Sequence, residues 1–258
     1  MIKIENFEVV GMEHAIRGMR NPMNSWEKSD SAAKCPYTTN DIICNCGENM
    51  CVGPNDLTLM KKLAAGGPVH AKYRRMIVVY LDITAPLYWW KEFDTYKVGT
   101  VANSCSTMHK IHDKEFTLED FSCEHLMEWS DFEDEVKPLQ PDVICNFKYY
   151  MMDTIHALNN ARDFYLKLKE NGADGHTLKR YWWQMIQLLP SSYNQKRTIM
   201  LNYEVLTGIY ESRKNHKLDE WREFCKWIEQ LPYSEIITGV RDVDMSKIRQ
   251  KNYGTKEE

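Results

Sequence analysis

The sequence has no long hydrophobic run and no large excess of charge of one sign. None of its apolar stretches approaches the roughly 20 residues that a membrane-spanning helix needs, so we expect no membrane partner. Its 33 lysines and arginines are nearly balanced by 37 aspartates and glutamates, which gives a net charge of −4. This balance excludes a uniformly basic protein that binds polymeric nucleic acid, although it allows a local basic patch.

Several familiar catalytic signatures are also missing. The sequence contains no G-x-S-x-G, G-x-x-x-x-G-K-[ST], H-E-x-x-H or G-x-G-x-x-G pattern. Common hydrolases, P-loop proteins, zinc proteases and Rossmann dinucleotide-binding proteins are therefore not indicated. With 43% hydrophobic and 27% charged residues, the composition is typical of a globular protein and not of a disordered one.

The N-terminal residues 1–10 alternate charged and apolar side chains, unlike a secretory signal. We therefore expect a reducing, cytoplasmic location, where the eight cysteines are thiols or metal ligands and not disulfides. Four of them gather in residues 32–55, interpreted as a cysteine-rich insertion loop: Cys35, Cys44, Cys46 and Cys51. Their C-x8-C-x-C-x4-C spacing lacks the paired knuckles of common zinc sites, so structural zinc and incidental thiols both stay open. The other four are expected to be small buried hydrophobes: Cys105, Cys123, Cys145 and Cys225.

Hydrophobic periodicity predicts a single α/β domain over residues 1–244, with helices dominating its second half, and a flexible tail over 245–258. The β-branched and apolar segments 2–10 and 76–83 are typical of strands. Helices are expected at residues 57–65, 85–98, 144–171, 177–189, 198–212 and 218–230. The expected caps are Asn55 or Asp56 for the first of these helices and Thr84 for the second.

Three segments combine side chains that suit an anionic ligand with a flat ring. In the first, Trp90 and Lys97 lie seven residues apart on an expected helix and share one face, and the hydroxyl-rich residues 103–109 follow. Aromatic faces stack on flat rings, while lysine and hydroxyl groups bind phosphate. The alternative interpretation is a core helix with its tryptophans inside, followed by a polar surface loop.

The other two segments are basic junctions between expected helices. Residues 188–202 place Lys196 and Arg197 just before an expected helix start, where an anion is favoured. Capping and surface solvation explain this segment equally well. The third segment contains Arg213 and His216, which are suited to a phosphate group but are also typical of a solvated basic loop.

In their order along the chain, these segments resemble the flavin-dependent thymidylate synthases. That family has an R-Q-W-x-R-H-R helix, an S-x-N-E-x-S-x-R-Y loop, an L-P turn followed by arginine, and a later arginine before a Q-x-E helix. The resemblance covers roughly residues 56–230. It places Glu92 at the family's glutamine, Lys97 at the last arginine of R-H-R, Asn103 and Ser106 in the loop, and Arg197 and Arg213 at the two later arginines.

The sequence also departs from the family pattern. Thr95 and Tyr96 replace the first two residues of R-H-R, Ser104 replaces the loop glutamate, and Met108 replaces the phosphate-binding arginine. Each charge-assisted phosphate contact is worth roughly 1.5–3 kcal/mol, so these losses bear directly on binding. Other cations are candidates to replace them: Lys110, Arg74, Arg75, Arg17 and Arg20.

The resemblance implies an α/β fold with an antiparallel or mixed sheet, long helices and a helix-rich C-terminal half, assembled as a homotetramer with active sites between subunits. It implies two sets of site residues: Glu92, Ser106 and Arg197 for dUMP, and Lys97, Asn103 and Arg213 for FAD. Reduced FAD would deliver a hydride, and folate and NADPH would be the further small-molecule partners. No protein nucleophile is required, because the flavin carries the redox chemistry.

Three functions are consistent with these observations. The first is a divergent flavin-dependent enzyme that methylates dUMP or carries out a related one-carbon modification of a pyrimidine deoxynucleotide. The second is a non-catalytic nucleotide-binding protein of the same fold, favoured by the missing arginines. The third is a zinc-stabilised interaction protein, for which the cysteine cluster is the motivating feature.

Overall fold

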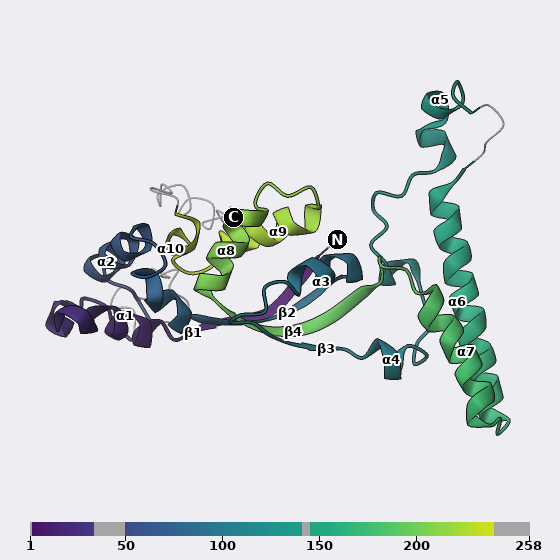
Figure 1. The fold of residues 1–258 in the computed structure, drawn as a ribbon, viewed down its shortest axis with the longest axis horizontal. Coiled ribbons are helices and arrows are strands. Elements are labelled where there is room, and N and C mark those ends of the chain that lie inside the picture. The colour runs from purple at the N-terminus through teal and green to yellow at the C-terminus, as the bar shows by residue number, and fades with distance from the viewer. Residues whose placement is uncertain (1, 34–49, 141–144, 240–258) are drawn as a thin grey trace, which may run out of the picture. The chain divides into compact units, whose positions relative to one another are not determined.

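The computed structural model describes residues 2–33, 50–140 and 145–239 (Figure 1). Packing divides the chain into two compact units. Unit 1 comprises Met1–Ile4, Ile83–Thr95 and Asn103–Thr198, and unit 2 comprises Glu5–Asp82, Tyr96–Ala102 and Ile199–Glu258. The predicted tail at 245–258 lies outside the described residues, so the predicted domain boundary at residue 244 stays a prediction.

Among the described residues, four strands form one antiparallel sheet in the order β1-β2-β4-β3. They are β1 (Lys3–Val10), β2 (Val78–Pro86), β3 (Val101–Ser104) and β4 (Asn194–Asn202). Hydrogen bonds at both ends of the β2–β4 pair set its register: the Leu87 amide donates to the Tyr193 carbonyl and the Tyr203 amide to the Ile77 carbonyl, each at 3.0 Å. The α/β fold class with an antiparallel sheet is thus confirmed, as are the strands predicted at 2–10 and 76–83.

The two longest helices of the described residues lie in unit 1 (Figure 1). Its helices are α3 (Leu87–Phe93), α4 (Thr107–Lys110), α5 (Glu133–Val136), α6 (Phe147–Glu170) and α7 (Gly175–Leu188). The long helices α6 and α7 pack against each other and bury Leu158 and Met185 with Phe116 and Phe121. Both were predicted from their periodicity, and their ends agree with prediction within a few residues.

Unit 2 contains α1 (Met12–Arg20), α2 (Pro54–Ala65), α8 (Tyr203–Arg213), α9 (Asp219–Ile228) and α10 (Glu235–Thr238). Helix α1 was not predicted, because the polar content of residues 11–31 obscured its buried stripe of Met12, Ala15, Ile16 and Met19. Short 3-10 helices in the two units lie at Asn21–Met23, Trp26–Lys28, Ala71–Met76, Leu118–Asp120 and Trp129–Asp131. No helix in the described ranges is long and apolar enough to cross a bilayer.

The predicted caps of two helices and the predicted start of a third helix are wrong. Helix α2 begins at Pro54 after Gly53, and Asp56 is a buried ion-pair partner instead of a cap. Strand β2 extends to Pro86, so Thr84 is a strand residue, and the helix expected at 85–98 shrinks to Leu87–Phe93. Lys97 lies beyond the end of this helix and shares no helical face with Trp90.

The wrong start of the third helix matters more for function. The helix expected at 198–212 begins only at Tyr203, where the Asn202 side chain accepts from the Val205 amide. Residues Asn194–Asn202 form strand β4 instead, with Gln195, Ile199 and Leu201 buried. Pairing with β2 overrides the local helical preference of this segment, because strand propensity depends on tertiary context. Lys196 and Arg197 therefore lie in a strand and not at a helix N-terminus.

Candidate functional site

Arg197 is held in one orientation by three contacts within unit 1. Its guanidinium carbon lies 4.2 Å from the ring centroid of Trp90, in the middle of helix α3, which follows β2. Its Nε donates to Gln195 Oε1 at 3.0 Å, and its Nη1 donates to Asp94 Oδ1 at 2.8 Å. The side chain is 15% exposed. A planar cation fixed on an aromatic face is pre-organised to bind an anion with little loss of side-chain freedom.

The two neighbouring tryptophans of α3 belong to the core. Trp89 and Trp90 are 0% and 1% exposed and pack with Phe93. Trp90 Nε1 donates to the Gln195 carbonyl at 2.9 Å. The alternative interpretation of a core helix is therefore correct, and neither indole offers an open face to a flat ligand. Trp90 contributes to the site indirectly, as the platform under Arg197.

Ser106 lies in an exposed turn after β3, at the start of α4. Its Oγ accepts from the His109 amide at 3.1 Å, which leaves its hydroxyl hydrogen available as a donor. The turn is tied to β4 twice: the Cys105 amide donates to the Lys196 carbonyl at 2.9 Å, and Gln195 Nε2 donates to the Cys105 carbonyl at 3.0 Å. Ser106 and Arg197, both predicted to bind dUMP, are thus connected through residues 195 and 196.

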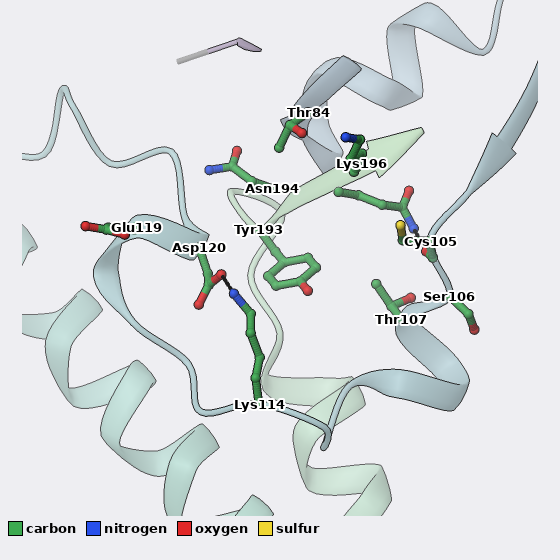
Figure 2. Close-up of a pocket in the computed structure, with 11 residues that line it drawn as sticks. Thr84, Cys105, Ser106, Thr107, Lys114, Glu119, Asp120, Tyr193, Asn194 and Lys196 are labelled. Atoms are coloured by element: carbon green, nitrogen blue, oxygen red, sulfur yellow. Dashed lines mark hydrogen bonds and ion pairs between the residues drawn. The ribbon is translucent and has the colours of Figure 1, made fainter. Parts of the chain in front are cut away.

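A pocket of about 250 Å³ lies beside this turn (Figure 2). Ser106, Lys114, Asp120, Tyr193 and Lys196 are among its lining residues. Lys114 forms an ion pair with Asp120, as the dashed line in Figure 2 shows. Burial, with a smaller contribution from the Asp120 charge, raises the pKa of the Tyr193 phenol, so this hydroxyl stays protonated at neutral pH.

Two of the predicted segments, residues 103–109 and 188–202, supply seven of the eleven lining residues, and the other four lay outside the predicted segments: Thr84, Lys114, Glu119 and Asp120. The lining residue Asp120 also forms a capping box with Thr117, at the start of the 3-10 helix Leu118–Asp120. Lys114 carried no recognisable spacing signal, because its segment meets the other lining segments only in the folded chain. Glu92, the third residue predicted to contact dUMP, is half-buried on α3 in the same unit.

The predicted flavin residues are divided between the units. Asn103 is exposed on β3 in unit 1, whereas Lys97 is exposed in unit 2, and Arg213 closes α8 in unit 2. Arg213 Nε donates to the Tyr96 hydroxyl at 2.9 Å, its Nη1 lies 3.0 Å from His216 Nε2, and its guanidinium lies 4.8 Å from the Trp221 ring centroid. Lys97 and Asn103 offer exposed groups that fit phosphate oxygens, while Arg213 is already engaged by its own unit.

Two of the candidate replacement cations are structural. Arg20 is buried against Asp56 at 2.6 Å, and Arg74 is buried with Glu204 at 3.7 Å. Neither is available to replace the arginines that the family pattern would supply. Lys110 pairs with Asp113 at 2.9 Å on the surface.

The cysteine predictions have mixed outcomes. Cys35, Cys44 and Cys46 lie outside the described residues, so the zinc interpretation stays a prediction; Cys51 pairs through its main chain with Ala32. Within the described ranges, no group of three or more His, Cys, Asp or Glu side chains is placed to hold a metal ion. Among the four cysteines expected to be buried, only Cys225 is; Cys105 is exposed, and Cys123 and Cys145 are half-buried.

Comparisons with known proteins identify the fold. No protein-family model matches the sequence, and no curated protein matches it. Among solved structures, thymidylate synthase X from Helicobacter pylori with FAD and dUMP matches with a TM-score of 0.55 and 16% identity, over 92% of this chain and 97% of that one. A second structure of that enzyme, also complexed with FAD and dUMP, matches with a TM-score of 0.54 and 16% identity, over 92% and 96%. The chain therefore has the fold of the flavin-dependent thymidylate synthases.

Proposed function

We propose that this protein binds a pyrimidine deoxynucleotide, dUMP or a close relative, and acts on it as a divergent flavin-dependent thymidylate synthase-like enzyme. The observation that carries the proposal is the fixed guanidinium of Arg197, linked through Gln195 to the turn that presents Ser106. The likeness in fold to an enzyme solved with FAD and dUMP supports it.

The three predicted nucleotide residues offer complementary chemistry. Within the described chain, no hydrogen bond uses Arg197 Nη2, so this atom can donate to a phosphate oxygen together with Nη1. Ser106 can donate its hydroxyl hydrogen to a second oxygen. The Glu92 carboxylate accepts hydrogen bonds and repels phosphate, so it suits a sugar hydroxyl or a base N–H group.

FAD is the proposed cofactor, with Lys97, Asn103 and Arg213 as the proposed binding residues. When bound, the flavin would supply the hydride chemistry, and the protein would supply position and charge. A homotetramer, folate and NADPH belong to the same proposal, as does a cytoplasmic location.

A non-catalytic nucleotide-binding protein is the second candidate function. One specific contact favours it: Arg197 already pairs with Asp94 at 2.8 Å, so an incoming phosphate meets a competing carboxylate. Weaker nucleotide binding and slow or absent turnover are the expected result of this arrangement.

Titration calorimetry of the full chain with dUMP tests the nucleotide proposal. Saturable binding is expected, with Arg197→Lys weakening it about tenfold because a lysine cannot reproduce the forked donor geometry. The matched control is Arg180→Lys, an exposed arginine on α7 in the same unit. If dUMP does not bind, or if the Arg197 and Arg180 variants behave alike, the proposed site is wrong.

Flavin content and turnover separate the two candidate functions. The absorption spectrum after reconstitution with FAD reports whether flavin binds, and NADPH oxidation that depends on dUMP reports turnover. A dUMP-dependent rate supports the enzyme and excludes the non-catalytic alternative. Nucleotide binding with no flavin bound and no NADPH oxidation supports the alternative and rejects the enzyme.

A further inference from the structure

The side chain of Gln195 joins the two segments that carry the proposed nucleotide contacts. Its Oε1 accepts from Arg197 Nε at 3.0 Å, and its Nε2 donates to the Cys105 carbonyl at 3.0 Å. The residue is 9% exposed, and both hydrogen bonds are partly buried. One buried amide therefore spans from a guanidinium on β4 to the turn that presents Ser106.

The orientation of this amide is determined by its partners. Arginine has donors and no acceptor, so only the amide oxygen can face Arg197, and only the amide nitrogen can face the Cys105 carbonyl. A flipped amide would place donor against donor and acceptor against acceptor. The main-chain carbonyl of Gln195 also accepts from Trp90 Nε1 at 2.9 Å, so the same residue anchors the ring beneath the guanidinium.

The alternation of a β-strand explains how one residue reaches both partners. Gln195 and Arg197 are two residues apart on β4 and project to the same side, whereas Lys196 projects to the other. The Lys196 carbonyl accepts from the Cys105 amide at 2.9 Å. The turn at residues 105–107 is thus fastened to β4 by a main-chain bond and by the Gln195 side chain.

We propose that Gln195 is a positioning residue that couples Arg197 to the turn at residues 105–107. An anion that binds Arg197 shifts its guanidinium and, with it, the Gln195 Oε1 that accepts from Arg197 Nε. Gln195 Nε2 then shifts the Cys105 carbonyl to which it donates, and with it the adjacent Ser106. The coupling is reciprocal, so a ligand that orders Ser106 also favours the binding orientation of Arg197. The part of this inference that concerns a nucleotide rests on the proposed function.

The first experiment needs no ligand, because exposed Cys105 reports on its own turn. The alkylation rate of Cys105 by iodoacetamide is followed by peptide mass spectrometry in the full chain. Gln195→Met, which removes both hydrogen bonds, and Arg197→Lys are each expected to raise the rate several-fold. Because both act through one link, the double variant is expected to react no faster than the faster single variant. Unchanged rates, or effects that multiply in the double variant, overturn the coupling.

A second variant covers the case in which Gln195→Met does not fold. Gln195→Glu keeps an acceptor for Arg197 but has no donor for the Cys105 carbonyl at neutral pH. This variant is expected to raise the alkylation rate of Cys105, while its carboxylate still accepts a hydrogen bond from Arg197. A wild-type rate in this variant contradicts the proposed link.

The nucleotide arm measures dUMP affinity by calorimetry in the same variants. Gln195→Met is expected to weaken dUMP binding about tenfold, and Gln195→Glu is expected to weaken it as well. Gln184→Met, on the exposed side of α7, is the matched control and is expected to bind as the wild type does. Wild-type affinity in both Gln195 variants overturns the positioning role. Absence of dUMP binding in the wild type rejects the proposed function, and the alkylation rates still decide the coupling.

Discussion

Arg197 and Asp94 form an ion pair at 2.8 Å although 103 residues separate them in the chain. The Asp94 carboxylate is 49% exposed at the end of α3, while the arginine side chain is 15% exposed. The cation proposed to hold a nucleotide phosphate therefore has a resident anionic partner. This relationship leads to the first of four predictions.

Asp94→Asn is expected to tighten dUMP binding two- to fivefold. The exchange removes the negative charge that competes with phosphate for Arg197, and partly exposed ion pairs are worth about 0–1 kcal/mol. Calorimetry measures the change in affinity. Asp163→Asn is the control, since Asp163 also pairs with an arginine, Arg162 at 3.0 Å, away from the site. Weaker dUMP binding in Asp94→Asn would show that Asp94 supports the ligand instead of competing with it.

Trp90 is expected to stabilise unit 1 as well as to support Arg197. Trp90→Ala removes a fully buried ring and is expected to lower the free energy of unfolding by about 3–5 kcal/mol. Trp90→Phe keeps a ring but leaves the Gln195 carbonyl without its indole donor, at a cost of about 1–3 kcal/mol. Urea unfolding measures both. Trp183→Phe, at a residue that is 40% exposed, is expected to change stability by less than about 0.5 kcal/mol.

The buried pair of Arg20 and Asp56 is expected to make stability depend on pH. Burial alone would raise the pKa of Asp56, but hydrogen bonds from Ser29, Ser31 and Arg20, with the Arg20 charge, hold it below its ordinary value of 3.8. A depressed pKa means that the stabilisation is fully present above about pH 4 and is lost as the pH falls through the folded-state pKa. Thermal unfolding between pH 2 and pH 7 is expected to show this loss.

Asp56→Asn isolates this contribution. It leaves the buried Arg20 charge without its counter-ion, which is expected to cost about 3–5 kcal/mol at neutral pH. The variant is also expected to lose less stability than the wild type on acidification. Asp153→Asn, at an exposed position on α6, is the control and is expected to resemble the wild type. Equal acid sensitivity in the wild type and Asp56→Asn would contradict the assignment.

Cys105 and Cys225 are expected to differ sharply in thiol reactivity. Burial, and then the Glu229 charge, raises the pKa of Cys225 to about 11, whereas Cys105 is exposed. The thiolate is the reactive form, so at pH 8 iodoacetamide is expected to modify Cys105 well before Cys225 in folded protein. Peptide mass spectrometry measures the order, and the two sites should react alike in urea. Early modification of Cys225 in the folded chain is the contrary outcome.

Local patterning predicted the elements whose side chains repeat with a clear period. The long helix expected at 144–171 and those at 177–189 and 218–230 correspond to α6, α7 and α9, and the strand at 76–83 corresponds to most of β2. Burial on these elements follows the period closely: Val79, Leu81, Ile83 and Ala85 alternate along β2 and are all fully or nearly fully buried. Burial does not follow apolar character everywhere on these elements, since Phe164 of α6 is 53% exposed.

The residues of the candidate site could be found from local spacing only in part. The resemblance to the flavin-dependent thymidylate synthases selected Ser106 and Arg197. The local pattern placed Arg197 just before a helix start, whereas it lies in strand β4. Gln195 and Tyr193 lie in the predicted segment 188–202 but had no role assigned to them, and Lys114 carried no signal of its own. Their contribution depends on which side of a strand they occupy and on which distant segment meets them, and neither is visible in local spacing.

Composition and the spacing of neighbouring residues were enough to predict the α/β class and the long helices, and to exclude a uniformly basic protein. Only in the folded chain does Trp90 become a buried platform for Arg197, with Gln195 linking this cation to the turn that presents Ser106. The physical reason is that β4 became a strand through its pairing with β2. That pairing brought together side chains about a hundred residues apart, which no local preference could specify.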